Sequence, residues 1–159
     1  MHIGLLKMDC TYYYHSKIGY FKIKIENDVL IELDKVEEKQ ENENYSKILP
    51  ELIKQLDEYF EGKRKCFTVP YKTKGTPFQE KVWKELTKIP YGETRSYKDI
   101  AIKVGCPKGY RAVGLANNKN KISIVIPCHR VIGTNKKLIG YSGGIKTKEQ
   151  LLDLEQKCK

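Results

Sequence analysis

Residues 20–33 alternate between apolar and polar side chains in two short runs. A period of two is typical of β-strands that bury one face. Asn27 and Asp28 separate the runs, and such a pair is typical of the tight turn of a β-hairpin. We therefore expect two antiparallel strands here. The residues expected on their buried face are Phe21, Ile23, Ile25, Val29, Ile31 and Leu33.

A helix is predicted after the polar segment "EEKQENENYS", which we interpret as a loop. Apolar residues recur at helical spacing from Leu49 to Phe60, and Gly62 follows as the expected stop. This first region, residues 1–74, contains no cluster of chemically reactive side chains. We expect it to be a supporting domain made of a small sheet and one amphipathic helix.

The second region, residues 75–159, is predicted to be mostly helical. Residues 76–79, "TPFQ", and residues 96–99, "SYKD", both fit the capping box that begins a helix. Gly105 closes the second of these helices, and the turn "CPKG" leads into a third, "YRAVGLANN". Two short helices joined by such a turn are typical of a helix-turn-helix. The same pair also occurs in purely structural roles.

The apolar run at residues 122–126 predicts a buried strand after the third helix. Pro127 ends this strand, because proline cannot donate a hydrogen bond to a sheet. The segment "GTNKKLIGYSGG" is expected to be a turn-rich loop or wing. A last amphipathic helix is predicted over residues 146–157.

Hydrophobic residues make up 40% of the chain and charged residues 31%, as in an ordinary soluble protein. No apolar run approaches the ~20 residues needed to span a bilayer, and the start lacks a secretory pattern. We therefore expect a cytoplasmic protein with no membrane partner. The five cysteines are widely spaced and form no C-x-x-C pair. This spacing argues against a disulfide framework and against a zinc ribbon. A metal site built from His2, Cys10, His15 and Cys66 remains an alternative, although its spacing matches no common ligand pattern.

The net charge of +10 lies entirely in the second region. Residues 1–75 contain 13 basic and 13 acidic side chains, whereas residues 76–159 contain 17 basic and 7 acidic ones. This asymmetry favours a polyanion such as nucleic acid as the partner of the second region. The third helix carries one charge, Arg111, among small residues, which predicts close approach to DNA with weak sequence preference.

The stretch "VIPCHRVIG" places Cys128 directly before His129 and Arg130. A thiol becomes a nucleophile as its thiolate, which neighbouring cations or a histidine favour. An isolated cysteine at the end of an apolar strand, however, usually serves packing. Adjacent residues of a strand also point to opposite faces, so Cys128 and His129 can cooperate only where Pro127 bends the chain.

Several segments together resemble, in order and spacing, the O6-alkylguanine-DNA alkyltransferases, also called methylated-DNA–protein-cysteine methyltransferases. These segments are "TPFQEKVWKELTKIPYGETRSYKDIA", "GYRAVGLANNKN", "IPCHRVIG", and "GYSGG" with "LLDLE". The close match covers residues 67–155, and its Pro-Cys-His-Arg-Val core is highly specific. The resemblance implies an α/β (α+β) fold. A ribonuclease H-like sheet-plus-helix domain precedes a winged-helix-like DNA-binding domain with a helix-turn-helix.

The resemblance also implies a set of catalytic roles. Cys128 matches the nucleophile that takes the alkyl group from O6 of guanine. His129 matches the residue that draws off the thiol proton through a water, and Glu155 the carboxylate that orients this histidine. Asn120 matches an asparagine that braces the active-site turn. Tyr97 matches a tyrosine that donates a proton to N3 of the departing guanine.

Further implied roles concern the substrate base and the DNA. Val131 matches a residue whose backbone carbonyl accepts from the exocyclic amine of guanine, and Ser142 a hydrogen-bonding residue near O6. Arg111 matches the finger that enters the base stack in place of the extruded nucleotide. The residues expected to bind the substrate base are Val131, Tyr141, Ser142 and Arg130. Those expected to bind DNA, in the minor groove, are Arg111, Ala112, Gly114, Asn117 and Asn118.

The implied reaction is an irreversible transfer, with one alkyl group taken up by each protein molecule, because no neighbouring group can expel a carbon-bound sulfur. It requires the base to be flipped out of the duplex, and it requires no metal or cofactor. The expected partner is double-stranded DNA containing O6-alkylguanine, and the protein is expected to act as a monomer. Two departures from the family pattern are Lys121 after Asn120, where proline is common, and the asparagines at positions 117 and 118.

Two other interpretations are weighed against this one. A non-catalytic DNA-binding module or damage sensor would bind DNA without taking up the alkyl group. Sensors that resemble the family commonly carry tryptophan in place of the cysteine, and Cys128 speaks against that class. A Cys-His hydrolase would instead turn over repeatedly and ignore DNA.

Overall fold

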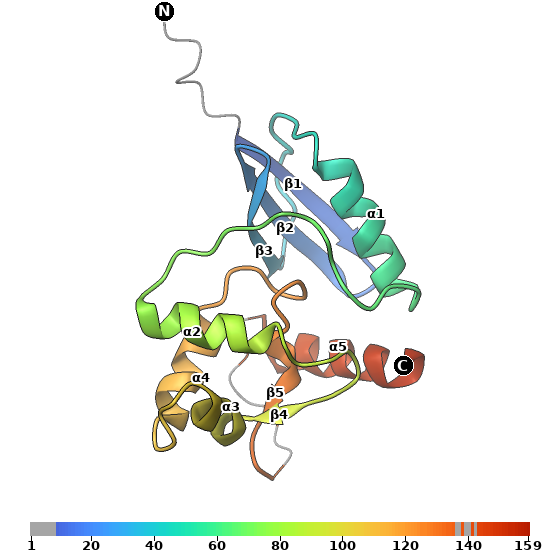
Figure 1. Cartoon of the computed structure of the whole chain (residues 1–159). Coiled ribbons are helices and arrows are strands. Elements are labelled where there is room, and N and C mark those ends of the chain that lie inside the picture. Colours follow the sequence, from blue (N-terminus) through green and yellow to red (C-terminus); the bar gives the residue numbers. More distant parts are fainter. Residues whose placement is uncertain (1–8, 136–137, 139–140, 142) are drawn as a thin grey trace, which may run out of the picture. The chain divides into compact units, whose positions relative to one another are not determined.

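The computed structural model describes residues 9–135, 138, 141 and 143–159 (Figure 1). The chain divides into two compact units, residues 1–72 and residues 73–159, which we call unit 1 and unit 2. The mixed α/β fold expected from the sequence is confirmed, since a small antiparallel sheet with one helix is followed by a mostly helical part. None of the helices in the described part of the chain is long and apolar enough to cross a membrane.

Unit 1 contains a three-stranded antiparallel sheet. Its strands, in spatial order, are β1 (Asp9–Ser16), β2 (Gly19–Glu26) and β3 (Val29–Val36). Asn27 and Asp28 connect β2 to β3 with φ angles of 53° and 59°. This left-handed geometry is that of the tight hairpin turn predicted from the sequence.

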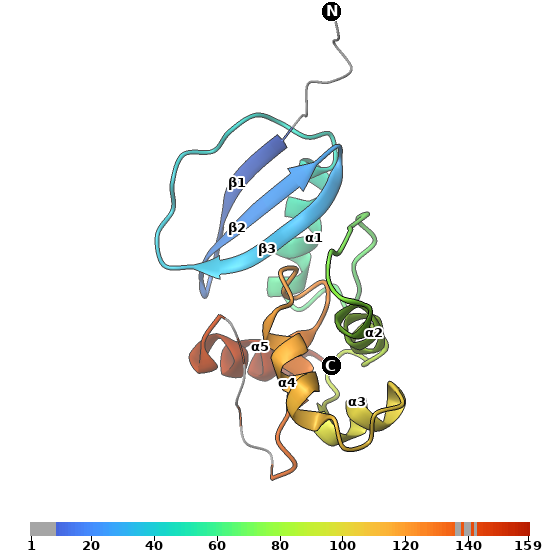
Figure 2. The same cartoon turned by 90° about the vertical axis from the view of Figure 1, so that its left-hand side faces the viewer.

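A single helix, α1 (Leu49–Phe60), covers one face of this sheet (Figures 1 and 2). At its C-terminal end the ring of Phe60 packs against Tyr14 of β1 and Phe21 of β2. Gly62 follows with φ of 76°, a conformation that glycine adopts without strain, so it ends the helix where the sequence predicts. The apolar residues of this core with 0% exposure are Phe21, Ile23, Leu30, Leu33, Leu52, Leu56 and Tyr59.

Two features of the sheet differ from the sequence-based expectation. The alternation pattern does not predict β1, because three consecutive tyrosines at positions 12–14 mask the period of two. In β3, the buried residues are Leu30 and Leu33, and neither Val29 nor Ile31 is among them. The cause is an irregularity in the pairing with β2, where the register shifts beside Ile25 and the expected alternation is broken.

The described residues of unit 2 form four α-helices, a short 3-10 turn and two very short strands. Its elements are α2 (Pro77–Leu86), β4 (Arg95–Ser96), α3 (Tyr97–Lys103), α4 (Tyr110–Asn118), the 3-10 turn η2 (Cys128–Arg130), β5 (Val131–Ile132) and α5 (Ile145–Cys158). Both predicted capping boxes are present, with Thr76 accepting from the Gln79 amide and Ser96 from the Asp99 amide. The two residues of β4 pair in parallel with β5.

The strand expected at residues 122–126 is absent from this described segment, which instead forms consecutive turns. The amide of Val125 donates to the carbonyl of Ser123, and the amide of Ile126 donates to that of Ile122. These local hydrogen bonds replace the ladder of a sheet. The apolar run is nevertheless buried, because Ile122, Ile124 and Ile126 are each 2% exposed or less.

Candidate active site

The turn before Cys128 is built around the side chain of Asn120. The amide nitrogen of Asn120 donates to the carbonyl oxygens of Ile122 at 3.4 Å and Ile126 at 2.9 Å, while its Oδ1 accepts from the Ile122 amide at 3.0 Å. Within this turn Ile124 has φ of 70°, which is strained for a β-branched residue. Such a conformation persists only where its surroundings hold it. Asn120 therefore makes the contacts that a bracing residue requires.

Cys128 begins the turn η2, and its side chain is 1% exposed. Pro127, with ψ of 65°, bends the chain directly before it. Because a 3-10 helix has three residues per turn, neighbouring side chains diverge by only about 120° instead of pointing to opposite faces. The bend that cooperation between Cys128 and His129 requires is thus present. The carbonyl of Cys128 is also fixed, since it accepts from the side-chain amide of Asn117 at 3.2 Å.

Glu155 of α5 connects His129 and Arg130 in a buried network. Nε2 of His129 lies 2.6 Å from Oε2 of Glu155. The guanidinium of Arg130 donates to both carboxylate oxygens, at 2.8 and 3.0 Å, and to the carbonyl of Ile89 at 2.8 Å. His129 and Glu155 are 0% and 1% exposed. Arg130, expected in the substrate pocket, is instead committed to Glu155, because a buried carboxylate requires a charged partner.

The charges in this network set the protonation of His129. Burial acts to raise the pKa of Glu155, but the hydrogen bonds from His129 and Arg130 outweigh it and hold that pKa well below its usual range. Burial lowers the pKa of His129, although Glu155 opposes this effect. We therefore take His129 as neutral and Glu155 as ionised. An ionised Glu155 can only accept, so Nε2 of His129 carries the proton and Nδ1 is left as the acceptor.

Nδ1 of His129 is buried and makes no hydrogen bond to the described residues. In the tautomer assigned above, Nδ1 carries the free lone pair and can accept a proton. Because His129 directly follows Cys128 in the chain, this acceptor belongs to the neighbour of the thiol. A neutral histidine oriented by a carboxylate is the arrangement that general-base activation of a neighbouring nucleophile requires.

Tyr97, the first residue of α3, is 7% exposed, and burial together with the nearby Cys128 raises its pKa to about 12. At neutral pH its hydroxyl therefore keeps its proton. The ammonium of Lys148, on α5, donates to the Tyr97 hydroxyl at 3.4 Å and also to the carbonyl of Val131. Tyr141 is 7% exposed, and Ser142 lies outside the described residues.

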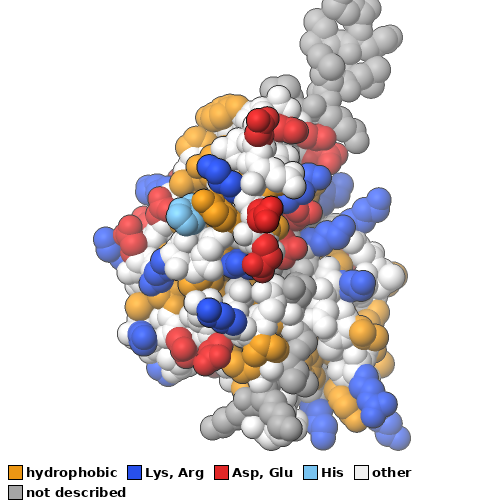
Figure 3. All heavy atoms as spheres, turned by 180° about the vertical axis from the view of Figure 1, so that it is seen from behind, with side chains coloured by type: hydrophobic (Ala, Val, Ile, Leu, Met, Phe, Trp, Pro, Cys, Tyr) orange, Lys and Arg blue, Asp and Glu red, His pale blue; other side chains and the backbone are white. Residues whose placement is uncertain are grey.

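Helix α4 presents Arg111, Ala112 and Leu115 to solvent, and Leu115 is 68% exposed. Figure 3 shows basic side chains projecting from this part of unit 2, with apolar ones between them. Asn117, expected to bind DNA, instead lies on the opposite face with 1% exposure, because its amide holds the Cys128 carbonyl. Gly114 faces α3, since a Cβ there would lie 3.8 Å from the Tyr97 ring. Asn118 is half-buried.

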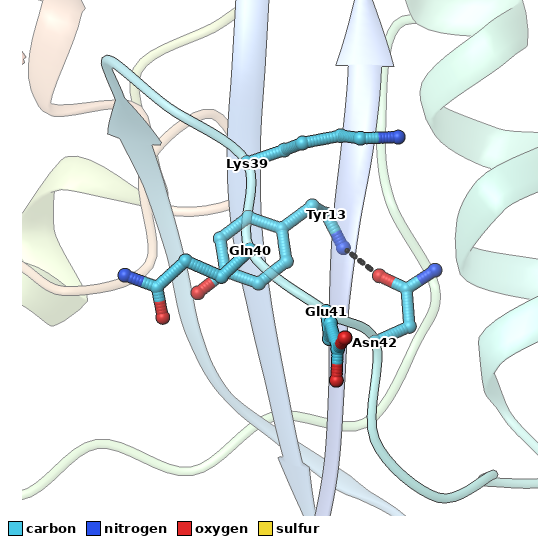
Figure 4. Close-up of a pocket in the computed structure, with 5 residues that line it drawn as sticks. All are labelled: Tyr13, Lys39, Gln40, Glu41 and Asn42. Carbon is cyan, nitrogen blue, oxygen red and sulfur yellow. Dashed lines mark hydrogen bonds between the residues drawn. The ribbon is translucent and has the colours of Figure 1, made fainter.

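Unit 1 contains an open hollow of about 560 Å³ (Figure 4). It is lined by Tyr13, Lys39, Gln40, Glu41 and Asn42, and the Tyr13 amide donates to the Asn42 side chain at 2.9 Å. Neither a thiol nor an imidazole is among these lining residues. Across the described residues, no group of three or more His, Cys, Asp or Glu side chains is arranged to hold a metal ion.

Sequence reasoning missed Lys148 and Leu115, and it placed Asn117 on the DNA-binding face. Lys148 is one of several lysines in a basic helix, and nothing in its spacing marks it as buried. Asn117 was assigned to the wrong face of α4, although its position four residues after Val113 places both on one helical face. Leu115 lies four positions after Arg111, so helical spacing places the two side chains on the same face of α4. This spacing could have identified Leu115 as an apolar residue on the face expected to bind DNA.

Family models match both units. Residues 77–157 match 6-O-methylguanine DNA methyltransferase, DNA binding domain, and residues 10–73 match 6-O-methylguanine DNA methyltransferase, ribonuclease-like domain. A methylated-DNA–protein-cysteine methyltransferase of Methanosarcina barkeri is 56% identical over 110 residues, which cover 69% of this chain and 70% of that relative.

Solved structures give the same result. The O6-methylguanine methyltransferase of Mycobacterium tuberculosis is similar with a TM-score of 0.87 and 42% identity, covering 96% of this chain and 95% of that one. The Mycobacterium tuberculosis OGT in complex with DNA is similar with a TM-score of 0.85 and 43% identity, covering 92% of both chains. On its sequence and its fold, the chain belongs to the O6-methylguanine DNA methyltransferase family.

Proposed function

We propose that the protein repairs DNA by transferring the alkyl group of O6-alkylguanine irreversibly to Sγ of Cys128. The observation that carries this proposal is the buried network in which Glu155 fixes a neutral His129 directly after the cysteine. The family membership supports the reaction class, and a relative solved in complex with DNA supports DNA as the partner.

The proton of the Cys128 thiol passes to Nδ1 of His129 through a water, while the Glu155 carboxylate stabilises the resulting imidazolium. The thiolate then attacks the alkyl carbon, so that an S–C bond forms and the C–O6 bond breaks. Guanine would depart as an anion unless it is protonated, and Tyr97, whose hydroxyl keeps its proton at neutral pH, donates to N3. The thioether product is stable, so each protein molecule acts once.

DNA binding is proposed for the exposed face of α4, with Arg111 filling the gap left by the flipped nucleotide. The small side chain of Ala112 and the exposed Leu115 fit a groove surface that discriminates little between bases. We propose that the protein acts on duplex DNA as a monomer with weak sequence preference. The supporting domain is proposed to span residues 1–74 and the alkyltransferase domain residues 75–159. Val131 and Tyr141 are proposed to contact the substrate base.

Intact-protein mass after incubation with a short duplex containing one O6-methylguanine tests the proposal. We expect a gain of one methyl group per protein molecule, and peptide mapping should place it on Cys128. The Cys128→Ser variant should take up no methyl group yet bind the same duplex as tightly as the unaltered protein.

The alternatives predict different outcomes of this experiment. Tight binding without any mass change would make the protein a damage sensor and Cys128 a packing residue. Repeated turnover of an ester or amide without DNA would favour a hydrolase. Loss of both transfer and binding in Cys128→Ser would show that the thiol is structural.

A further inference from the structure

A turn between α2 and β4, residues 89–93, contacts the guanidinium of Arg130 through two of its residues. The carbonyl oxygen of Ile89 accepts from this guanidinium at 2.8 Å. The guanidinium carbon also lies 5.6 Å from the centre of the Tyr91 ring. A cation within about 6 Å of a ring centre is attracted by the face of the ring. Because Tyr91 is half-buried, this contact is partly shielded from water. We call this segment the 89–93 turn.

The 89–93 turn also contacts Glu155. The backbone amide of Gly92 donates to Oε1 of Glu155 at 3.3 Å, and the carbonyl of Gly92 accepts from the side chain of Gln156 at 2.8 Å. Gly92 has φ of 79°, a conformation that glycine adopts without strain. Two adjacent residues of α5, Glu155 and Gln156, are therefore tied to the turn by hydrogen bonds.

Four hydrogen bonds converge on the Glu155 carboxylate. Arg130 donates two of them, Gly92 donates one, and His129 donates one in the tautomer assigned above. An ionised carboxylate offers about four lone-pair sites. Oε1 accepts from Arg130 and Gly92, whereas Oε2 accepts from Arg130 and His129. The contacts on Oε1 thus fix the direction in which Oε2 faces the imidazole.

We propose that the 89–93 turn is a positioning element of the active site, which holds Arg130 and Glu155 so that the carboxylate stays directed at His129. The turn acts on the thiol through these side chains. An imidazolium that faces a well-oriented carboxylate stabilises the neighbouring thiolate, so the turn makes the Cys128 thiol more acidic. This inference rests on the proposed function only in taking Cys128 as the nucleophile.

The titratable groups around the site come from several elements. Burial lowers the pKa of His129, Glu155 opposes this shift, and Arg130 and Lys148 add to it. Tyr97 of α3 and Lys148 of α5 interact electrostatically with Cys128.

The phenol of Tyr91 stays neutral near neutral pH, because burial and then Glu155 raise its pKa above its usual value. Substitution of Tyr91 therefore removes no charge from the site. It also leaves the side chains of the other titratable groups unaltered. A change in the acidity of Cys128 in such a variant reports how the network is held.

The pH dependence of Cys128 methylation by methyl iodide tests the inference. Methyl iodide reacts with the thiolate and needs neither DNA nor a proton for its leaving group, so the midpoint of the rise with pH reports thiolate formation. Peptide mapping separates Cys128 from the exposed Cys66 and Cys106. The measurement uses the full chain.

Tyr91→Leu should move this midpoint upward by about one pH unit and slow methylation below the midpoint by about tenfold. The reason is that Arg130 loses the ring beneath it, and Glu155 is then held less firmly toward the imidazole. Tyr91→Phe retains the face of the ring and should behave as the unaltered protein. An equal shift in Tyr91→Phe would assign the effect to the hydroxyl and overturn the inference.

The matched control is Tyr110→Leu. It also removes a tyrosine ring that lies 5.6 Å from a cation, in this case Lys98, within the same unit. Its midpoint should equal that of the unaltered protein. A midpoint that stays in place in Tyr91→Leu, or moves equally in Tyr110→Leu, would contradict a specific role of the turn.

Gln156→Ala decides the question if Tyr91→Leu does not fold, as checked by circular dichroism. Gln156 is exposed, so its substitution should be tolerated, yet it removes the hydrogen bond to the Gly92 carbonyl. Methylation below the midpoint should slow by about threefold, with the midpoint again moved upward. Lys157→Ala, at the next exposed position of α5, should change neither quantity, and an unchanged midpoint in Gln156→Ala would then sink the proposal.

Failure of the proposed function gives a different result. The unaltered protein would then take up no methyl group from a duplex containing O6-methylguanine. The methyl iodide profiles of the variants would still report whether the 89–93 turn controls the acidity of Cys128.

Discussion

Glu155 holds two partners with one carboxylate, and this sharing explains why His129 is both neutral and fixed in orientation. Hydrogen bonds to the charged form keep the carboxylate ionised in a site that otherwise disfavours charge. Arg130 binds both oxygens of this carboxylate, whereas His129 contacts one of them. Arg130 therefore influences the protonation and orientation of His129 through Glu155, although Arg130 itself takes no part in the proposed reaction.

The Glu155→Gln substitution should lower the free energy of unfolding by about 3–5 kcal/mol, because it leaves the buried Arg130 without a counter-charge. It should also slow alkyl transfer, since the tautomer of His129 is no longer fixed. Urea denaturation and single-turnover kinetics measure the two effects. The exposed Glu149 of the same helix provides the control, and Glu149→Gln should change neither quantity. Equal losses in both variants would contradict the role of the network.

The pH dependence of stability follows from the same carboxylate. Because the folded pKa of Glu155 is depressed, its contribution is present above the unfolded value of about 4.5 and is lost as the pH falls toward the folded pKa. The lowered pKa of His129 acts in the same direction below about 6.5, since the unfolded chain then binds the extra proton. Below about pH 4.5 the unaltered protein should therefore lose stability more steeply than Glu155→Gln.

At the scale of elements, α4 separates two tasks on two faces. Its inner face carries Val113, Ala116 and Asn117, and the last of these holds the backbone of Cys128. Its outer face carries Arg111 and Leu115 and is free of acidic residues. One helix of nine residues thus contacts the nucleophile's turn on one side and presents the proposed DNA surface on the other.

The Arg111→Ala substitution should slow methyl transfer from duplex O6-methylguanine by about tenfold or more, while transfer from the free base changes little. The reason is that only the duplex leaves a gap that a side chain must fill. Mass spectrometry of the methylated protein over time gives both rates. Lys103→Ala, which removes an exposed basic residue of α3, serves as the control. A similar decrease on both substrates would remove the finger role from Arg111.

At the scale of the whole molecule, the two parts of the chain differ in net charge as well as in fold. The acidic and basic side chains of residues 1–75 balance, whereas the excess of ten positive charges lies beyond them. Duplex affinity should therefore fall by about tenfold or more between about 50 mM and about 200 mM salt, because bound phosphates release counterions. Fluorescence anisotropy with Cys128→Ser measures this without alkyl transfer. A flat salt response would contradict an electrostatic origin of the affinity.

Much of this molecule could be predicted from the sequence, and the failures have physical causes. Capping boxes are local signals, so helices α2 and α3 begin where expected, at Pro77 and Tyr97. The turns at residues 122–126 could not be foreseen from the apolar run alone. The side chain of Asn120, which lies outside this run, donates to the Ile126 carbonyl and so takes the place of a neighbouring strand as hydrogen-bond partner. The burial of Lys148 is likewise a tertiary effect. Its partners lie 17 and 51 residues away along the chain.

The burial of Cys128 protects its thiol from oxidants and electrophiles before it meets a damaged base. Oxidants convert accessible thiolates first, and Cys66 and Cys106 are exposed whereas Cys128 is 1% exposed. A nucleophile that acts once is lost if a peroxide or a stray electrophile reaches it before the damaged base does. Cys66 and Cys106 should therefore react with these chemicals before Cys128 does. The thiol of Cys128 then stays reduced until a flipped base enters the site.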